Sequence, residues 1–182
     1  ALADRQQLPA LVDAELTRLR AQAQRAQTAL ALASQLATDD PGKYETFHTT
    51  VETAPVHRLH GTATAETLDD VVPPVIEQLI REAGESSAPV TGRYPVQLEG
   101  EFDFDVNVPS ESGRFELPGG DFVGVVHTGP FTLLPLAYHA LFEELSNMGA
   151  PVTGPIRERY LSEPDQESAQ ELRTEVLIRL RL

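Results

Sequence analysis

The sequence of 182 residues has no cysteine and no tryptophan. It has few basic residues, with 14 Lys and Arg against 28 Asp and Glu. The lack of cysteine excludes disulfides, zinc–thiolate sites and thiol nucleophiles, and is compatible with a reducing cytoplasm. The formal net charge of −14 argues against direct nucleic-acid binding by this chain, because phosphate backbones are recognised by basic surfaces. No apolar run approaches the roughly 18 residues of a membrane span, and the start lacks a signal-peptide pattern. We therefore expect a cytoplasmic protein without a membrane partner.

The first 38 residues predict a coiled-coil dimerisation helix. Residues 8–37 contain no Gly and only Pro9, at the entrance, and good helix formers dominate them. Apolar residues recur with 4-3-4-3 spacing at Val12, Leu16, Leu19, Ala23, Ala26, Leu30, Ala33 and Ala37. A period of about 3.5 residues is typical of helices that pair with a partner. A single amphipathic helix packed on its own domain is the alternative interpretation.

Residues 43–182 predict one α+β domain in which a β-β-α-β-β unit occurs twice, over about 43–110 and 111–182. The expected strands are 46–51, 56–60, 93–98 and 101–108 around a helix at 67–83, then 114–117, 122–127, 156–161 and 172–180 around a helix at 132–148. Pro73 and Pro74 predict a late start or a kink in the first helix. Ala88-Pro89-Val90-Thr91-Gly92 recurs at 150–154, which favours an internal repeat. Two such units are expected to place their helices on one sheet face and a groove on the other.

The last strand of each unit carries a candidate acid. Alternation puts Asp103, Asp105 and Asn107 on the face opposite Phe104, Val106 and Val108, and puts Glu175 and Leu177 on the face opposite Val176 and Ile178. Asp105 is then the counterpart of Glu175. A carboxylate in a groove attracts cations, and aromatic faces add to that attraction. We expect Tyr160 to be the aromatic residue nearest Glu175, and Tyr94 to occupy the equivalent position in the first repeat. A solvated acid on an exposed strand face is the alternative.

Metal, phosphate-loop and dinucleotide patterns are absent from the sequence. His57 and His60 are three residues apart on an expected strand and so face opposite ways, and His139 has no second histidine at i+4. We therefore expect no metal, no cofactor and no catalytic residue.

Four segments resemble the gyrase-inhibitor-like (GyrI-like) effector-binding domain: residues 119–131, 136–139, 154–161 and 172–178. The resemblance is closest from Arg114 to the C-terminus. It implies a pocket between the repeats that takes lipophilic, often cationic compounds, with Glu175 as the pocket acid and Tyr160 as a lining aromatic. The candidate ligand-binding residues are Glu175, Tyr160, Asp105, Tyr94, Leu177 and Tyr138.

With the heptad helix, the resemblance implies the effector-binding and dimerisation module of a MerR-family transcription regulator, a multidrug-type sensor. Such a module is expected to form a homodimer and to reach DNA only through a DNA-binding domain outside this chain. The chain is then expected to be the C-terminal part of a longer protein, or a stand-alone relative. One alternative is a GyrI-like hydrolase in which Glu175 and Tyr160 activate water. Another is a module that sequesters a protein partner.

Overall fold

The strands and helices follow the order β-β-α-β-β twice. The structure, a computed structural model, describes residues 44–84, 86, 88–152, 154–162 and 168–180, so the helix expected at 1–38 lies outside the described residues. The first half comprises β1 (Thr46–Val51), β2 (Ala54–Thr64), α2 (Leu68–Ala83), β3 (Val90–Tyr94) and β4 (Glu101–Pro109). The second comprises β5 (Phe115–Leu117), β6 (Gly120–Thr128), the 3-10 turn Phe131–Leu133, α3 (Leu134–Asn147), β7 (Ile156–Tyr160) and β8 (Arg173–Arg179). The α+β class and the order of elements are as predicted.

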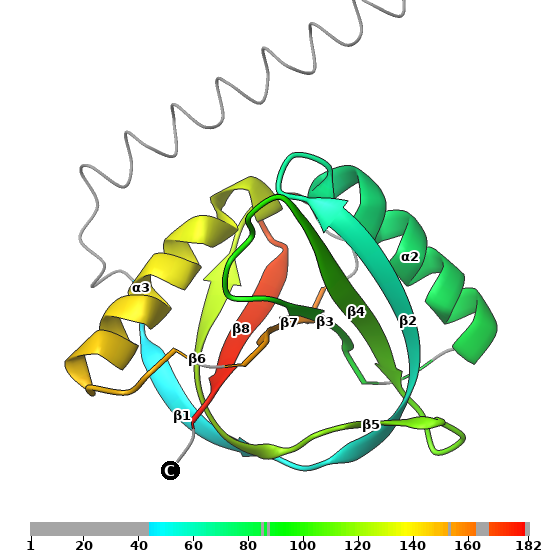
Figure 1. Cartoon of the computed structure of the whole chain (residues 1–182), viewed down its shortest axis with the longest axis horizontal. Coiled ribbons are helices and arrows are strands. Elements are labelled where there is room, and N and C mark those ends of the chain that lie inside the picture. The colour runs from blue at the N-terminus through cyan, green and yellow to red at the C-terminus, as the bar shows by residue number, and fades with distance from the viewer. Residues whose placement is uncertain (1–43, 85, 87, 153, 163–167, 181–182) are drawn as a thin grey trace, which may run out of the picture. The chain divides into compact units, whose positions relative to one another are not determined.

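The strands form one antiparallel sheet in the order β1-β6-β8-β7-β3-β4-β2-β5. The two halves meet at β3 and β7, where Gly92 lies opposite Glu158 at the centre of the paired segment. Figure 1 shows that the sheet curls strongly, and the pairing of β2 with β5 brings the first half back to the chain that leads into β6. The curl gives the sheet an outer face, which the helices cover, and an inner face, which is turned toward the inside of the curl.

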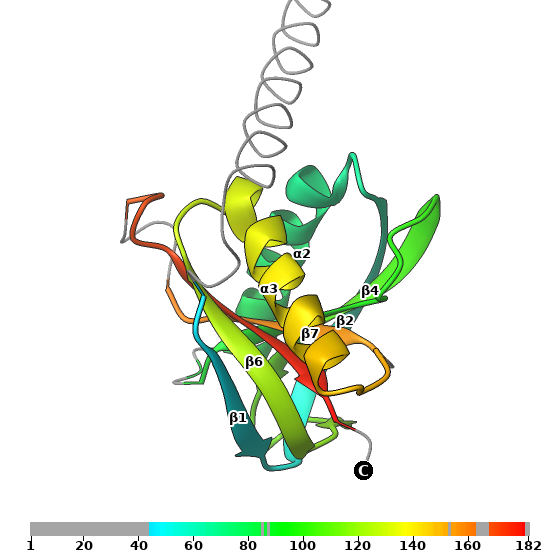
Figure 2. The same cartoon turned by 90° about the vertical axis from the view of Figure 1, so that its left-hand side faces the viewer.

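Each helix buries an apolar stripe against the outer face of its own half. Ala137, Leu141 and Leu145 of α3 pack on Val123, Val125, Val176 and Ile178 from β6 and β8, and Figure 2 shows α3 lying across these strands. Leu79 of α2 packs in the same way on Phe102, Phe104, Val106 and Val108 of β4. Every second residue of each strand reaches this face, because side chains alternate along a strand. Burying a Leu or Val side chain of this kind contributes roughly 1.5–3 kcal/mol to folding.

The third strand of the first half starts and ends earlier than predicted. The strand expected at 93–98 is observed as Val90–Tyr94, because Pro95 has no N–H to donate to a neighbouring strand. As a result, 90–92 lie within β3, whereas the second copy of the repeated pentapeptide precedes β7. The recurring letters therefore do not mark equivalent positions. By strand position, Gly92 is equivalent to Glu158 and Tyr94 to Tyr160.

The first helix also differs from the expectation of a late start. It begins at Leu68, with Pro73 and Pro74 inside it. Both prolines are exposed, so water can occupy the space beside the carbonyl groups that their missing N–H groups leave without a donor. Within the part of the chain that the structure describes, no helix has the length and apolarity needed to cross a membrane.

Candidate functional site

A buried carboxylate and three tyrosines meet on the outer face where the two halves join. Glu158 and Tyr160 share a face of β7 with the core residue Ile156, because the three are two residues apart. The Glu158 carboxylate accepts one hydrogen bond from the hydroxyl of Tyr138 on α3 and one from Tyr160 at 2.9 Å. The hydroxyl of Tyr94, on β3, lies 2.7 Å from that of Tyr160. We call these four residues the tyrosine–glutamate cluster.

Glu158 has an unusual electrostatic setting. The residue is only 8% exposed, and no ion pair within the described residues includes it. Burial raises the pKa of the Glu158 carboxyl, and the charge of Asp69 adds to this, while the hydrogen bonds from Tyr138 and Tyr160 act in the opposite direction. The charged form of Glu158 is thus supported by hydroxyl groups rather than by a cation.

The three tyrosines are held as hydrogen-bond donors. Burial, and then the charge of Glu158, raise the pKa of each of the Tyr94, Tyr138 and Tyr160 hydroxyls. Each hydroxyl therefore keeps its proton at neutral pH. The cluster can stabilise negative charge on Glu158, and its ring faces can contact an apolar or cationic group.

Gly92 gives the tyrosines their space. A Cβ atom at this position would fall 2.6 Å from the Tyr94 ring and 2.9 Å from the Tyr160 hydroxyl, both closer than real contacts allow. The ring of Phe131 meets the Tyr160 ring edge-on, with centroids 6.0 Å apart. The cluster therefore depends on the absence of a side chain at the residue that faces Glu158 across the strand pair.

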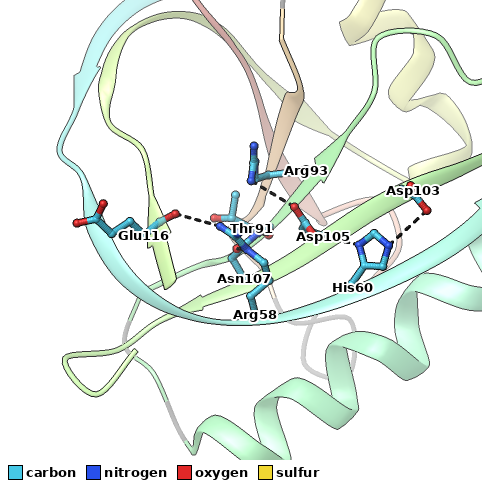
Figure 3. Close-up of polar contacts among 8 residues, drawn as sticks. All are labelled: Arg58, His60, Thr91, Arg93, Asp103, Asp105, Asn107 and Glu116. Carbon is cyan, nitrogen blue, oxygen red and sulfur yellow. Dashed lines mark hydrogen bonds and ion pairs between the residues drawn. The ribbon is translucent and has the colours of Figure 1, made fainter. Parts of the chain in front are cut away.

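The acids predicted from sequence lie on the inner face and are paired with arginines. Glu175 lies opposite Arg159, with 2.5 Å between their charged groups. Asp105 lies opposite Arg93, at 3.2 Å, and it also contacts His60 (Figure 3). The two pairs occupy equivalent positions in the two halves. Each acid already has a cationic neighbour, which sets both apart from Glu158.

The six candidate residues are divided between the two faces of the sheet. Tyr94, Tyr138 and Tyr160 come together on the outer face. Glu175, Asp105 and Leu177 lie on the inner face, where Leu177 is fully buried beside Gly124. The expectation that Tyr160 is the aromatic nearest Glu175 is corrected, because Thr174 is the residue opposite Tyr160 and Glu175 points the other way.

Sequence reasoning missed Glu158. The available signal was the alternation in Ile156-Arg157-Glu158-Arg159-Tyr160, which places this acid on the same face as a core isoleucine and a tyrosine. The acid predicted from sequence was instead Glu175, on the following strand. No group of three or more potential metal ligands occurs among the described residues.

Solved structures with this fold include two of EcmrR. The EcmrR C-terminal domain superposes with a TM-score of 0.63 at 18% identity, covering 76% of this chain and 98% of that one. EcmrR in complex with DNA gives a TM-score of 0.65 at 17% identity, covering 92% and 70%. At these identities the likeness shows a shared fold.

Two further structures share the fold at lower similarity. SAV2435 bound to tetraphenylphosphonium has a TM-score of 0.55 at 11% identity, covering 75% of this chain and 94% of that one. A hydrolase from Listeria innocua has a TM-score of 0.54 at 12% identity, covering 75% and 92%. No curated protein matches the sequence. Residues 75–181, which include β5 to β8 and all four residues of the tyrosine–glutamate cluster, match the GyrI-like small molecule binding domain. The chain therefore belongs to the GyrI-like small molecule binding domain family.

Proposed function

We propose that this chain is the effector-binding module of a MerR-type transcription regulator and that it binds lipophilic cations at the tyrosine–glutamate cluster. The observation that carries the proposal is Glu158, a buried acid supported only by tyrosine hydroxyls among its described contacts. Two relatives support it: EcmrR was solved with DNA, and SAV2435 with tetraphenylphosphonium, a lipophilic cation.

The chemistry of the cluster suits such a ligand. A carboxylate that has lost most of its water gains strongly from a nearby cation, because the local dielectric is low. The rings of Tyr94, Tyr138 and Tyr160 offer apolar surface and favourable contact with positive charge. A ligand that combines an apolar body with a delocalised charge uses both properties. A small hydrophilic cation gains less, since it loses its own hydration on entering.

Entry of a ligand requires movement of the cluster. Tyr94 is 3% exposed and Glu158 is 8% exposed, so the site is closed as described. A ligand that takes the place of the Tyr138 ring beside Glu158 would displace part of α3, which carries Tyr138. Such a displacement can act as a signal only if the ligand binds the displaced form more tightly than the closed form. We further propose that residues 1–38 pair two copies of the chain, and that DNA is contacted by a domain outside it.

The assignment is tested by titrating tetraphenylphosphonium against the protein and two isosteric variants. Glu158→Gln is expected to weaken binding at least about tenfold, the effect of losing one strong charge interaction of about 1.4 kcal/mol. Glu175→Gln is the matched control, because it removes the same charge from the other face of the sheet. Calorimetry gives both affinities. The assignment to the tyrosine–glutamate cluster is wrong if both variants weaken binding equally. It is also wrong if only Glu175→Gln weakens binding, and the site then lies on the inner face.

A hydrolase is the second candidate, and one contact favours it. The Tyr160 hydroxyl lies 2.9 Å from Glu158, so a carboxyl and a phenol are within hydrogen-bond reach, and one structural relative is a hydrolase. The pair considered from sequence, Glu175 with Tyr160, is divided by the sheet. Steady hydrolysis of an activated ester that disappears in Glu158→Gln and persists in Glu175→Gln would favour the enzyme.

A further inference from the structure

The inner face of the sheet collects most of the positive charge of the described domain. Arg58, Arg93, Arg157, Arg159 and Arg179 point to this face from β2, β3, β7 and β8, as alternation along each strand requires. Elsewhere the described residues carry only Arg81, Arg114 and Arg173. The acids that alternation places on the inner face are Glu101, Asp103, Asp105 and Glu175, and the last two are paired with Arg93 and Arg159. In a chain with a net charge of −14, this concentration of guanidinium groups needs a physical reason.

Arg157 is the most buried of these cations. It is 5% exposed, its guanidinium donates a hydrogen bond to the carbonyl of Pro118, and it lies 4.6 Å from the centre of the Phe122 ring. These are neutral contacts. Burial, and then the charges of Arg93, Arg179 and Arg159, lower the pKa of Arg157 to about 10. Arg157 is therefore a buried cation, and the neighbouring charges that lower its pKa are also cations.

Arg93 lies directly opposite Arg157 in the register of β3 and β7. Like charges at directly opposed positions destabilise a strand pair. The Nη1 atom of Arg93 forms an ion pair with the Asp105 carboxylate. The buried Nε atom of Arg93, in contrast, has no hydrogen-bond partner in the described structure. A buried donor without an acceptor is unfavourable, so an acceptor between Arg93 and Arg157 would stabilise the pair.

Arg58 extends the group within the first half, from β2. Its guanidinium donates to the side-chain oxygen of Asn107 at 2.8 Å and to the carbonyl of Glu116 at 3.0 Å, as Figure 3 shows. Both acceptors are neutral. The charge of Arg58 also contributes to the lowered pKa of Arg93, after burial, the largest cause. Arg58 and Arg157 thus have no carboxylate partner within the described chain.

One member of this group, Arg93, lines a depression in the surface of the described domain. The depression has a volume of about 640 Å³ and is lined by Arg93, by the segment Tyr94–Gln97 that follows β3, and by His60, Asp103, Phe104, Asp105, Val152, Gly154 and Pro155. His60 contacts both Asp103 and Asp105 at 3.3 Å. The volume is enough for a small molecule rather than a macromolecule.

We propose that the inner face binds a small polyvalent oxyanion, carrying phosphate or carboxylate groups, between Arg93 and Arg157 and within reach of Arg58. Planar guanidinium groups suit such a ligand because each can donate two parallel hydrogen bonds to one oxyanion. The ligand supplies the negative charge that the strand pair lacks and an acceptor for the unpartnered Nε of Arg93. This site is separate from the tyrosine–glutamate cluster, although both use β7: its odd-numbered residues face the oxyanion and its even-numbered residues face the tyrosines.

The test measures binding of inorganic phosphate and of succinate to the full chain by calorimetry, with sodium chloride at equal ionic strength as the reference. Either oxyanion is expected to bind and to raise the thermal unfolding temperature above that in chloride. Binding of phosphate alone assigns a phosphate-bearing ligand, and binding of succinate alone assigns a carboxylate-bearing one.

Variants then locate the site. Arg58→Gln is expected to weaken binding about tenfold, the effect of losing a charge-assisted hydrogen bond. Arg81→Gln is the matched control, because it removes the same charge from an exposed position on α2 and should change affinity less than about twofold. Arg157→Lys keeps the buried charge but loses the planar fork, and should also weaken binding. The proposal is overturned if neither oxyanion binds better than chloride, or if Arg81→Gln weakens binding as much as Arg58→Gln.

Discussion

The two faces of the sheet hold their carboxylates in opposite ways. On the outer face, Glu158 is almost fully buried and is supported by the hydroxyls of Tyr138 and Tyr160. On the inner face, Glu175 and Asp105 are more accessible, with 13% and 25% of their side chains exposed, and each contacts an arginine. All three acids lie in strands near the join of the two halves.

This difference shows that the partners of an acid, rather than its place in a strand, decide what it can bind. An acid that already has an arginine neighbour gains little from a second cation, because the first has neutralised most of its field. An acid that accepts hydrogen bonds only from hydroxyl groups still gains strongly from binding a cation. The outer face is therefore suited to a cationic ligand and the inner face, with its surplus of arginines, to an anionic one.

The largest effects are expected from filling the space beside a glycine on each face. A Cβ at Gly92 meets Tyr94 and Tyr160, and a Cβ at Gly124, on the inner face, meets Leu177 at 2.4 Å and Phe47 at 2.8 Å. Gly92→Ala and Gly124→Ala are each expected to lower the free energy of unfolding by about 1–3 kcal/mol, the usual cost of overpacking. Urea denaturation measures this loss.

Only Gly92→Ala should also weaken tetraphenylphosphonium binding, because only this substitution displaces the tyrosine rings. The two glycines thus serve as controls for each other. Similar loss of binding in Gly124→Ala would show that the two faces do not act separately.

A pH series sharpens the comparison through Glu158. Its pKa is raised in the folded protein, so the stability linked to its protonated form is fully present below the unfolded pKa of about 4.3 and is lost as pH rises through the folded pKa. Glu158→Gln cannot titrate and should lose less stability over this range than the wild type. Glu175→Gln keeps Glu158 and is the control that should retain this loss.

Cation affinity should change with pH in the opposite sense. Tetraphenylphosphonium is expected to bind more tightly as pH rises and Glu158 loses its proton, by up to about tenfold per pH unit below the folded pKa and then no further. Calorimetric titrations across the range measure the slope. A flat profile in the wild type would mean that Glu158 is not the group to which the cation binds.

The smallest effects are expected from the two inner-face ion pairs. Double-mutant cycles with Arg159→Gln and Glu175→Gln, and with Arg93→Gln and Asp105→Asn, should give coupling energies of about 1 kcal/mol or less, because both pairs are partly exposed. The first cycle should give the larger value, since its groups are 2.5 Å apart rather than 3.2 Å. The reverse order would show that distance does not rank these pairs.

Local regularity made much of the fold predictable. Side chains alternate along a strand, so the division of β4 into Phe104 and Val106 on one face and Asp103 and Asp105 on the other followed from the letters alone. The apolar stripe of α3 and the glycines after the helices located both helices to within a few residues. The tyrosines of the cluster were also among the candidate residues.

The choice of acid could not be made in this way. Glu158 and Glu175 both lie in short alternating strands with an aromatic residue or an arginine nearby in sequence. Which acid meets Tyr138 depends on where α3 crosses the sheet, and which meets Arg159 depends on the register of β7 against β8. The local sequence pattern predicts neither of these contacts.

The sequence by itself determined the order of elements, the two alternating faces and the residue types available on each. Tertiary structure decided which charges meet. Pro95 shifted β3 toward the N-terminus, and the pairing of β3 with β7 then set Gly92 against Glu158 and Arg93 against Arg157. The physical reason is that strand period fixes only the parity of a residue, whereas packing of distant segments fixes its neighbours.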